Sequence, residues 1–250
     1  MLAHHIAREY AASNVVLLHG FTQSRAMWDD FVSKIFHTSR VVTIDLPGHG
    51  GSGGITASLP EAGDLVVDVS GVATYVGYSL GARVALHIAL QHPASVSKLV
   101  LCGANPGIVD LVERAQRKHD DDVLASHIED IGVEPFIDEW LATPLFARLR
   151  VAEQDRASRL VNSALGLASS LRTMGLGTQE NLWPSLSKLT MPVLIITGAD
   201  DEKFTKIGER MVSSIGAQAT HIVVPQCGHS VPLEQPNIFS DLISAFIADT

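Results

Sequence analysis

Residues 76–86 read VGYSLGARVAL and place a serine, Ser79, between two glycines. A run with strand character, 73–78, leads into this stretch, and a run with helical character, 80–91, leads out of it. Side chains at the two glycine positions would collide with neighbouring elements in so tight a turn. The pattern predicts a nucleophile elbow that lifts the Ser79 hydroxyl above a sheet. The alternative interpretation is a serine that caps a helix.

Continuous apolar runs that recur along the chain are typical of strands buried on both faces of a sheet. These runs lie at 15–19, 41–45, 73–78, 98–103, 192–198 and 221–225. Segments with a helical pattern alternate with them, at 26–36, 59–70, 80–91, 205–214 and 235–247. The alternation predicts an α/β fold in which helices flank a mostly parallel central sheet on both faces.

The interval 105–183 interrupts this alternation, because it holds amphipathic helical patterns and no apolar strand run. An interval of this length needs structure of its own. We therefore expect a helical lid inserted between two strands of the sheet. Residues 1–104 and 184–250 are expected to form the core, and the whole chain a single structural domain.

Composition narrows the classes of function. The chain has 250 residues, 46% of them hydrophobic, and a formal net charge of −9, which argues against a nucleic-acid partner. Its apolar runs are too short to span a membrane, and the N-terminus lacks the pattern of a signal peptide, so we expect a soluble cytoplasmic protein. The distant Cys102 and Cys227 fit a reducing compartment. The sequence carries no indication of an oligomeric state.

The glycine-rich stretch 48–54, GHGGSGG, resembles a nucleotide-binding loop only in composition. It lacks the Lys-Ser/Thr pair of a phosphate-binding loop and the spaced glycines that open a dinucleotide-binding helix. Nucleotide binding is therefore not expected.

A serine at neutral pH needs a base, and His229 is the best placed of the 11 histidines. It lies in a loop that begins with glycine, directly after the last strand run. His49 and the pair His4 and His5 lack this position, the chain order or both. We expect His229 to be the general base; the alternative is a structural histidine.

Two carboxylates, Asp200 and Asp201, follow the strand run at 192–198 and could orient the base. The acid usually lies three residues after the glycine that ends this strand, which favours Asp201. Asp200 remains the alternative acid. If it does not orient the base, we expect it to be a solvated charge in the loop or at the start of a helix. Serine, acid and histidine then follow one another in the order of the α/β-hydrolases.

Backbone amides near Ser79 could bind a developing negative charge. The amide of Leu80 lies at the start of a helix, and that of Phe21 follows the strand run at 15–19. We expect these two amides to form an oxyanion hole. His19, two residues before Phe21, is expected to pack in the loop.

Arg83 lies one helical turn beyond Ser79, on the same face of the predicted helix. It could clamp a substrate carboxylate, or it could form a buried ion pair, and the sequence alone favours neither. The predicted lid adds further arginines, most of them expected at the surface: Arg114, Arg117, Arg148, Arg150, Arg156, Arg159 and Arg172. Trp140, Phe146 and Trp183 are expected to pack the lid.

Several longer motifs are more specific than the elbow. They are DLPGHGGS (45–52), VGYSLGARVALHIAL (76–90), NPGI (105–108), ERAQRKHDD (113–121), TPLF (143–146), LGTQENLW (176–183) and GADDEKF (198–204). Together they resemble the 2-succinyl-6-hydroxy-2,4-cyclohexadiene-1-carboxylate (SHCHC) synthases of menaquinone biosynthesis, members of the α/β-hydrolase superfamily. The resemblance runs from about Val15 to His229 and includes the predicted lid.

The resemblance implies a cofactor-independent carbon–oxygen lyase without a metal. Its substrate would be a small polycarboxylate, 2-succinyl-5-enolpyruvyl-6-hydroxy-3-cyclohexene-1-carboxylate, from which pyruvate is eliminated. Ser79, activated by His229 and oriented by Asp201, would remove a ring proton. The amides of Phe21 and Leu80 would stabilise the anion. The substrate-binding positions of the family fall on Arg83, Arg117, Arg159, Tyr78 and Trp140, with Arg114 as an alternative to Arg117.

Two other functions use the same residues differently. A carboxylesterase or carbon–carbon bond hydrolase would combine this triad with a water molecule and an apolar acyl pocket. A receptor with the hydrolase fold would bind a small ligand with little turnover. Arg83 and two lid arginines facing the serine would favour the lyase.

Overall fold

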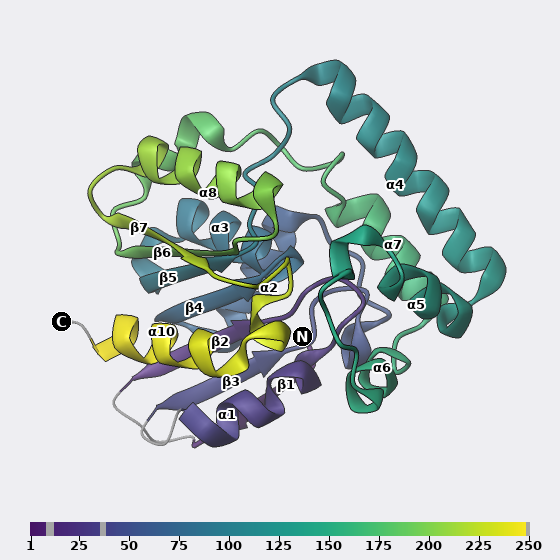
Figure 1. Ribbon diagram of the computed structural model, residues 1–250, viewed down its shortest axis with the longest axis horizontal. Helices are drawn as coiled ribbons and strands as arrows, with labels where there is room; N and C mark the ends of the chain where they lie inside the picture. Colours follow the sequence, from purple (N-terminus) through teal and green to yellow (C-terminus); the bar gives the residue numbers. More distant parts are fainter. Residues whose placement is uncertain (9–12, 36–38, 249–250) are drawn as a thin grey trace.

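The computed structural model describes residues 1–8, 13–35 and 39–248 (Figure 1). Within these ranges its centre is a seven-stranded sheet in the order β1-β3-β2-β4-β5-β6-β7. The strands are β1 (His4–Ala7), β2 (Asn14–Leu18), β3 (Arg40–Ile44), β4 (Ala73–Tyr78), β5 (Val96–Cys102), β6 (Val193–Gly198) and β7 (Ala219–Val224). All pairings are parallel except that of β1 with β3. The predicted fold class is confirmed.

Alternating side chains of the strands supply two separate hydrophobic cores, one on each face of the sheet. On β2, Val16 and Leu18 pack into one core, whereas Val15 and Leu17 pack into the other. Helices α2 (Leu59–Ser70), α3 (Leu80–Gln91) and α8 (Glu202–Ile215) contribute to the first core. Helices α1 (Asp29–Ile35) and α10 (Pro236–Ala248) cover the opposite face (Figure 1). The central strands are therefore buried on both sides, as their uninterrupted apolar runs indicate.

The core also contains four short helical elements. They are the 3-10 helices η1 (Arg25–Trp28), η2 (Gly50–Ser52) and η3 (Pro93–Ser95) and the single turn α9 (Val231–Glu234). The helix predicted at 26–36 begins as η1 and continues as α1; Phe36 lies outside the described residues. Strand β1 was not predicted, because it is a four-residue edge strand whose residues stay partly exposed and form no apolar run.

Between β5 and β6 the described chain forms helices and no strand. They are α4 (Leu111–Ile131), α5 (Val133–Leu141), η4 (Pro144–Phe146), α6 (Glu153–Arg159), α7 (Ala164–Met174) and η5 (Trp183–Lys188). Side chains of α4, α5 and α7 share a third core that includes Ile128, Phe136 and Leu167. Figure 1 shows α4, α5, α6 and α7 together at one end of the sheet. We refer to residues 105–183 as the helical insertion.

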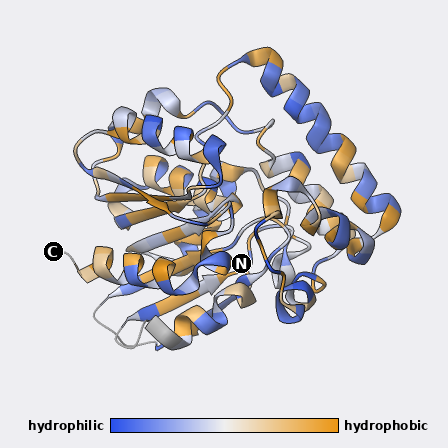
Figure 2. Ribbon diagram, in the orientation of Figure 1, coloured by the Kyte–Doolittle hydropathy of each residue, from blue (hydrophilic) through white to orange (hydrophobic). Residues whose placement is uncertain are grey.

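The hydropathy of the residues differs between the sheet and the helical insertion. Figure 2 shows hydrophobic residues along the strands and alternating hydrophilic and hydrophobic segments along α4. Among the described helices, none combines the length and the apolar character that crossing a bilayer requires.

His87 on α3 gives the fold a measurable response to acid. The side chain is 3% exposed, and its Nε2 has no hydrogen-bond partner in the described structure. Burial, together with the nearby Arg83 guanidinium, lowers its pKa from 6.5 to about 4. The unfolded chain therefore binds a proton at a pH where the folded chain does not, and stability is lost as the pH falls from about 6.5 toward 4.

We predict that His87→Leu flattens this dependence. In chemical denaturation between pH 7 and pH 4.5, the free energy of unfolding of the variant should fall less steeply, by roughly 1 kcal/mol per pH unit. His119→Gln, on an exposed face of α4, is the matched control and should retain the parental slope. Equal slopes for His87→Leu and the parent would show that His87 is not held neutral.

Candidate active site

The turn between β4 and α3 holds Ser79 in a strained conformation with φ 51° and ψ −106°. The Ser79 amide donates to the carbonyl of Cys102 at 2.8 Å, which anchors the turn to β5. A Cβ atom on Gly77 would lie 2.3 Å from the Gly81 carbonyl oxygen, and one on Gly81 would lie 2.2 Å from that of Leu18. Only glycine fits at both positions. The local geometry is that of the predicted elbow.

Ser79, His229 and Asp201 form a continuous hydrogen-bonded chain. His229 Nε2 lies 3.2 Å from Ser79 Oγ, and His229 Nδ1 lies 2.8 Å from Asp201 Oδ2. Asp201 caps the N-terminus of α8, where its Oδ1 accepts from the amide of Phe204 at 3.3 Å. The carboxylate thus fixes the ring so that Nε2 can accept a proton from the serine hydroxyl.

The two candidate carboxylates have different partners. Asp201 meets His229, whereas Asp200 forms an ion pair with Arg148, 2.9 Å from Nη2 to Oδ2. Arg148 is exposed in that pair and belongs to the helical insertion. The structure therefore brings together Ser79, His229 and the favoured carboxylate, and directs the alternative one away.

The loop that carries His229 has supports that the sequence did not reveal. Glu234 accepts from the amides on either side of the histidine, from Gly228 at 2.7 Å and from Ser230 at 2.9 Å. The ring of Phe204 packs against the imidazole with centroids 4.4 Å apart. The GADDEKF motif contains Phe204, but its contact with His229 depends on how α8 packs and cannot be read from spacing.

Two backbone amides are free to face the serine. Neither Phe21 nor Leu80 donates its amide in any backbone hydrogen bond among the described residues, and both residues line the cavity at Ser79. The turn from Gly20 to Gln23, which contains Phe21, is closed by the Gln23 side chain, whose Oε1 accepts from the Gly20 amide at 3.0 Å. His19 packs in this loop as expected, accepting from the Leu46 amide at 3.0 Å. Burial lowers the His19 pKa to about 4 and keeps the ring neutral.

A cavity of about 490 Å³ opens above the elbow, between the core and the helical insertion. Ser79, Asp201 and His229 line one part of it. Arg83 and Arg117 line another, together with the half-buried ring of Trp140 from α5. Arg114, the alternative to Arg117, is not part of the lining. Trp140 meets Phe21 edge to face, with ring centroids 5.5 Å apart, and so covers the proposed oxyanion turn.

Arg83 makes no ion pair within the described residues. Its Nη1 donates to the carbonyl of Met174 at 2.7 Å and to Gln179 Oε1 at 3.1 Å, which orients the guanidinium without neutralising it. Burial and the neighbouring Arg117 lower the Arg83 pKa to about 10, so the group is cationic at neutral pH. The ion pair that the sequence left open for Arg83 is not formed.

Arg117 reaches the cavity from α4 and is held by Asp121 one turn further along, with 2.7 Å between Nε and Oδ1. Asp121 is buried and also accepts from the amide of Gly177 at 3.0 Å. Arg117 therefore has a carboxylate partner in Asp121, and a second carboxylate, Asp120, also lines the cavity. The guanidinium of Arg83, which has no carboxylate partner among the described residues, is suited to an anionic ligand.

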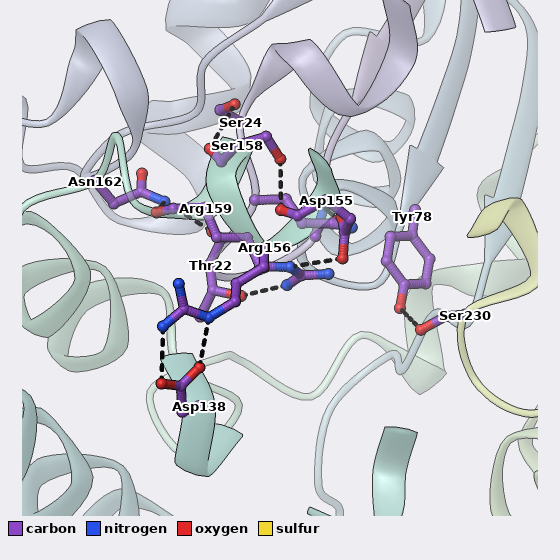
Figure 3. A network of polar contacts seen from close by, with 12 residues as sticks. Thr22, Ser24, Tyr78, Asp138, Asp155, Arg156, Ser158, Arg159, Asn162 and Ser230 are labelled. Carbon is purple, nitrogen blue, oxygen red and sulfur yellow. Dashed lines mark hydrogen bonds and ion pairs between the residues drawn. The ribbon is translucent and has the colours of Figure 1, made fainter. Parts of the chain in front are cut away.

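Tyr78 and Arg159 lie in the layer behind the cavity and not on its surface. The Tyr78 hydroxyl and Ser230 Oγ are 2.8 Å apart, and burial raises the pKa of this phenol. Arg159 is 1% exposed and turned toward Thr22 and Asp155 (Figure 3). These two partners fix the guanidinium, and Arg159 is not among the residues that line the cavity.

The described residues contain no group of three or more His, Cys, Asp or Glu side chains arranged to hold a metal ion.

Known sequences are similar to this chain over most of its length. The model of the "Alpha/beta hydrolase family" matches residues 15–242. The "Putative 2-succinyl-6-hydroxy-2,4-cyclohexadiene-1-carboxylate synthase" of Bacillus subtilis (strain 168) is 36% identical, over 95% of this chain and 91% of the relative. The 2-succinyl-6-hydroxy-2,4-cyclohexadiene-1-carboxylate synthase of Serratia proteamaculans (strain 568) is 29% identical, over 94% and 93% of the two chains.

Solved structures are similar to this chain over nearly its whole length. MenH from S. aureus superimposes with a TM-score of 0.90 at 31% sequence identity, covering 98% of this chain and 97% of that one. A thermophilic esterase from Thermogutta terrifontis superimposes with a TM-score of 0.83 at 23% identity, covering 98% and 92%. The second similarity shows the shared fold alone.

The two aspartates allow a matched test of the triad. We predict that Asp201→Asn slows the reaction of Ser79 with a fluorophosphonate by roughly a thousandfold or more, because the ring of His229 loses the partner that sets its tautomer. Asp200→Asn should react at nearly the parental rate. Intact-protein mass spectrometry follows both reactions. A larger loss in Asp200→Asn than in Asp201→Asn would reverse the assignment.

Proposed function

The chain belongs to the alpha/beta hydrolase family and, within it, to the family of the SHCHC synthases, and from this membership we propose that it is a cofactor-independent lyase. It would eliminate pyruvate from 2-succinyl-5-enolpyruvyl-6-hydroxy-3-cyclohexene-1-carboxylate. One observation supports this most directly: the hydrogen-bonded Ser79, His229 and Asp201 share a cavity with two arginines, of which Arg83 makes no ion pair.

The names of substrate and product define the bonds that change. A 3-cyclohexene becomes a 2,4-cyclohexadiene, so a proton leaves ring carbon 2 and the double bond between carbons 3 and 4 shifts to carbons 4 and 5. A new double bond forms between carbons 2 and 3, and the bond from carbon 5 to the enolpyruvyl oxygen breaks. The enolpyruvate that leaves takes up a proton and becomes pyruvate. No water is consumed.

In our proposal Ser79 is the base. His229 Nε2 accepts the serine proton as Ser79 Oγ takes the proton from carbon 2, and Asp201 stabilises the imidazolium. The carbonyl of the succinyl group adjoins carbon 2, so negative charge develops on its oxygen. The amides of Phe21 and Leu80 would bind that oxygen. A positioned base contributes about 10²–10⁴-fold and one such amide about 10²–10³-fold.

The substrate carries three carboxylates, and we assign them to the part of the cavity that Arg83 and Arg117 line. Arg83 and Arg117 would bind carboxylates directly, with Trp140 packing against the ring of the substrate. Arg159 would add its positive charge from the layer behind the cavity, and Tyr78 would support the loop of His229 through Ser230. An ester hydrolase has no need for two guanidinium groups beside its acyl pocket.

We also propose that the helical insertion, residues 105–183, is the lid of this site. It supplies Arg117 and Trp140 to the cavity, whereas the core segments 1–104 and 184–250 supply the triad, both amides and Arg83. Substrate would then contact both parts of the single domain at once.

Release of pyruvate tests the proposal. The precursor is generated enzymatically, the protein is added, and pyruvate is followed through lactate dehydrogenase with correction for spontaneous breakdown. We expect rapid release, and a decrease of at least about a thousandfold in Ser79→Ala, whose fold should be intact.

A short-chain p-nitrophenyl ester in a parallel reaction provides the comparison. Rapid ester cleavage with pyruvate at background would identify a hydrolase instead. Near-parental pyruvate release by Ser79→Ala would remove Ser79 from the mechanism.

Replacing a guanidinium tests how charge is recognised. We predict that Arg83→Met raises the KM for the tricarboxylate by roughly tenfold or more, the loss expected for one charge-assisted contact, and leaves ester cleavage nearly unchanged. Arg172→Met removes an arginine that is paired with Glu129 on the outside of the insertion and should alter neither reaction. Equal losses on both substrates in Arg83→Met would indicate a structural arginine.

A further inference from the structure

Thr22, the residue after Phe21, has a backbone conformation that needs external support. It is fully buried, and its φ of 68° lies in the left-handed region, where a β-branched side chain is a genuine outlier. Such a conformation persists only where the surroundings hold it. Thr22 directly follows Phe21 in the chain, so the same support also restrains the backbone at Phe21.

All three polar groups of Thr22 are held by buried side chains from elsewhere in the chain. Its hydroxyl accepts from Arg159 Nη1 at 2.6 Å, and its carbonyl accepts from Asn162 Nδ2 at 2.7 Å. Its amide donates to His49 Nε2 at 3.3 Å. Figure 3 shows Arg159 and Asn162 beside Thr22 at the end of α6. Two of the three contacts therefore come from the helical insertion.

Asn162 connects more than one segment. Its Oδ1 accepts from the Gly50 amide at 2.8 Å, and its Nδ2 donates to the Arg159 carbonyl at 2.8 Å as well as to Thr22. This single buried amide joins the turn after β2, the loop after β3 and the end of α6. It touches neither the triad nor the cavity.

His49 completes the support from the side of the core. Its Nδ1 donates to the Pro47 carbonyl at 3.0 Å, which leaves Nε2 as the acceptor for Thr22. The ring also meets Phe21 edge to face, with centroids 5.7 Å apart. Full burial keeps the imidazole neutral, so this acceptor persists at neutral pH.

We infer that Thr22 and Asn162 are positioning residues through which the helical insertion holds the Phe21 amide in line with Ser79. The inference rests on the proposed role of that amide in binding the anion formed at the site. It makes the insertion a part of the catalytic geometry in addition to a cover: displacing α6 would move the oxyanion turn as well as the substrate contacts.

A matched pair at Thr22 tests the inference. Thr22→Val keeps the shape and the β-branch but removes the hydroxyl that accepts from Arg159, whereas Thr22→Ser keeps the hydroxyl. We expect Thr22→Val to lower the kcat for pyruvate release at least about tenfold with KM within about twofold, because a misdirected amide loses part of the 10²–10³-fold worth of one oxyanion donor. Thr22→Ser should restore most of the parental kcat.

Asn162→Ala is the second variant. We expect it, like Thr22→Val, to lower the kcat for pyruvate release and to leave KM nearly unchanged. Melting temperatures and the fraction of folded protein are measured alongside, since a merely structural role would lower stability and leave the kcat of the folded enzyme unchanged. That result in both Thr22→Val and Asn162→Ala would overturn the inference. If Asn162→Ala does not fold, the Thr22 pair decides.

The rate at which Ser79 reacts with a fluorophosphonate separates this inference from the proposed function. The phosphonyl oxygen uses the oxyanion amides whatever the natural substrate is. Slower phosphonylation in Thr22→Val than in Thr22→Ser supports the inference even if the parent releases no pyruvate, in which case only the lyase proposal fails. Equal phosphonylation rates in the two variants contradict the inference, whatever the outcome with the precursor.

Discussion

The strained backbone of Ser79 is the constraint from which the rest of the site is built. Its positive φ is possible because Gly77 and Gly81 leave space for the turn and because β4 and α3 are fixed by the cores on either side of the sheet. The turn raises the hydroxyl into the cavity toward His229 and exposes the Leu80 amide at the start of α3. A relaxed turn would lose the nucleophile, the base contact and one anion donor together.

Two arginines line the cavity beside Ser79. Arg83 is oriented by a carbonyl and an amide oxygen, so its charge remains available, while Arg117 is held by Asp121. The two arginines come from the core and from the insertion. A polycarboxylate would therefore bind across the boundary between the two parts, at the place where α6 also fixes the oxyanion turn. Binding, anion stabilisation and the position of the insertion are linked by this arrangement.

The sequence predicts best what depends on local spacing. The elbow and the choice of Asp201 follow from short motifs whose geometry is fixed by the strand or helix beside them. Edge strand β1 was missed because it is held by pairing with β3 and not by an apolar run. The position of Arg159 behind the cavity could not be foreseen, since it depends on Thr22, 137 residues away in the chain. The role of Asn162 could not be predicted from the sequence either, because its contact with Thr22 joins residues 140 positions apart.

In the proposed reaction Ser79 removes a ring proton and forms no acyl-enzyme. A precursor that carries deuterium on ring carbon 2 tests this directly in a single turnover, with excess protein and with intact-mass analysis of quenched samples. We expect a markedly slower turnover than with the unlabelled precursor and no added mass on Ser79. Equal rates for the two precursors, together with an acyl adduct on Ser79, would contradict it.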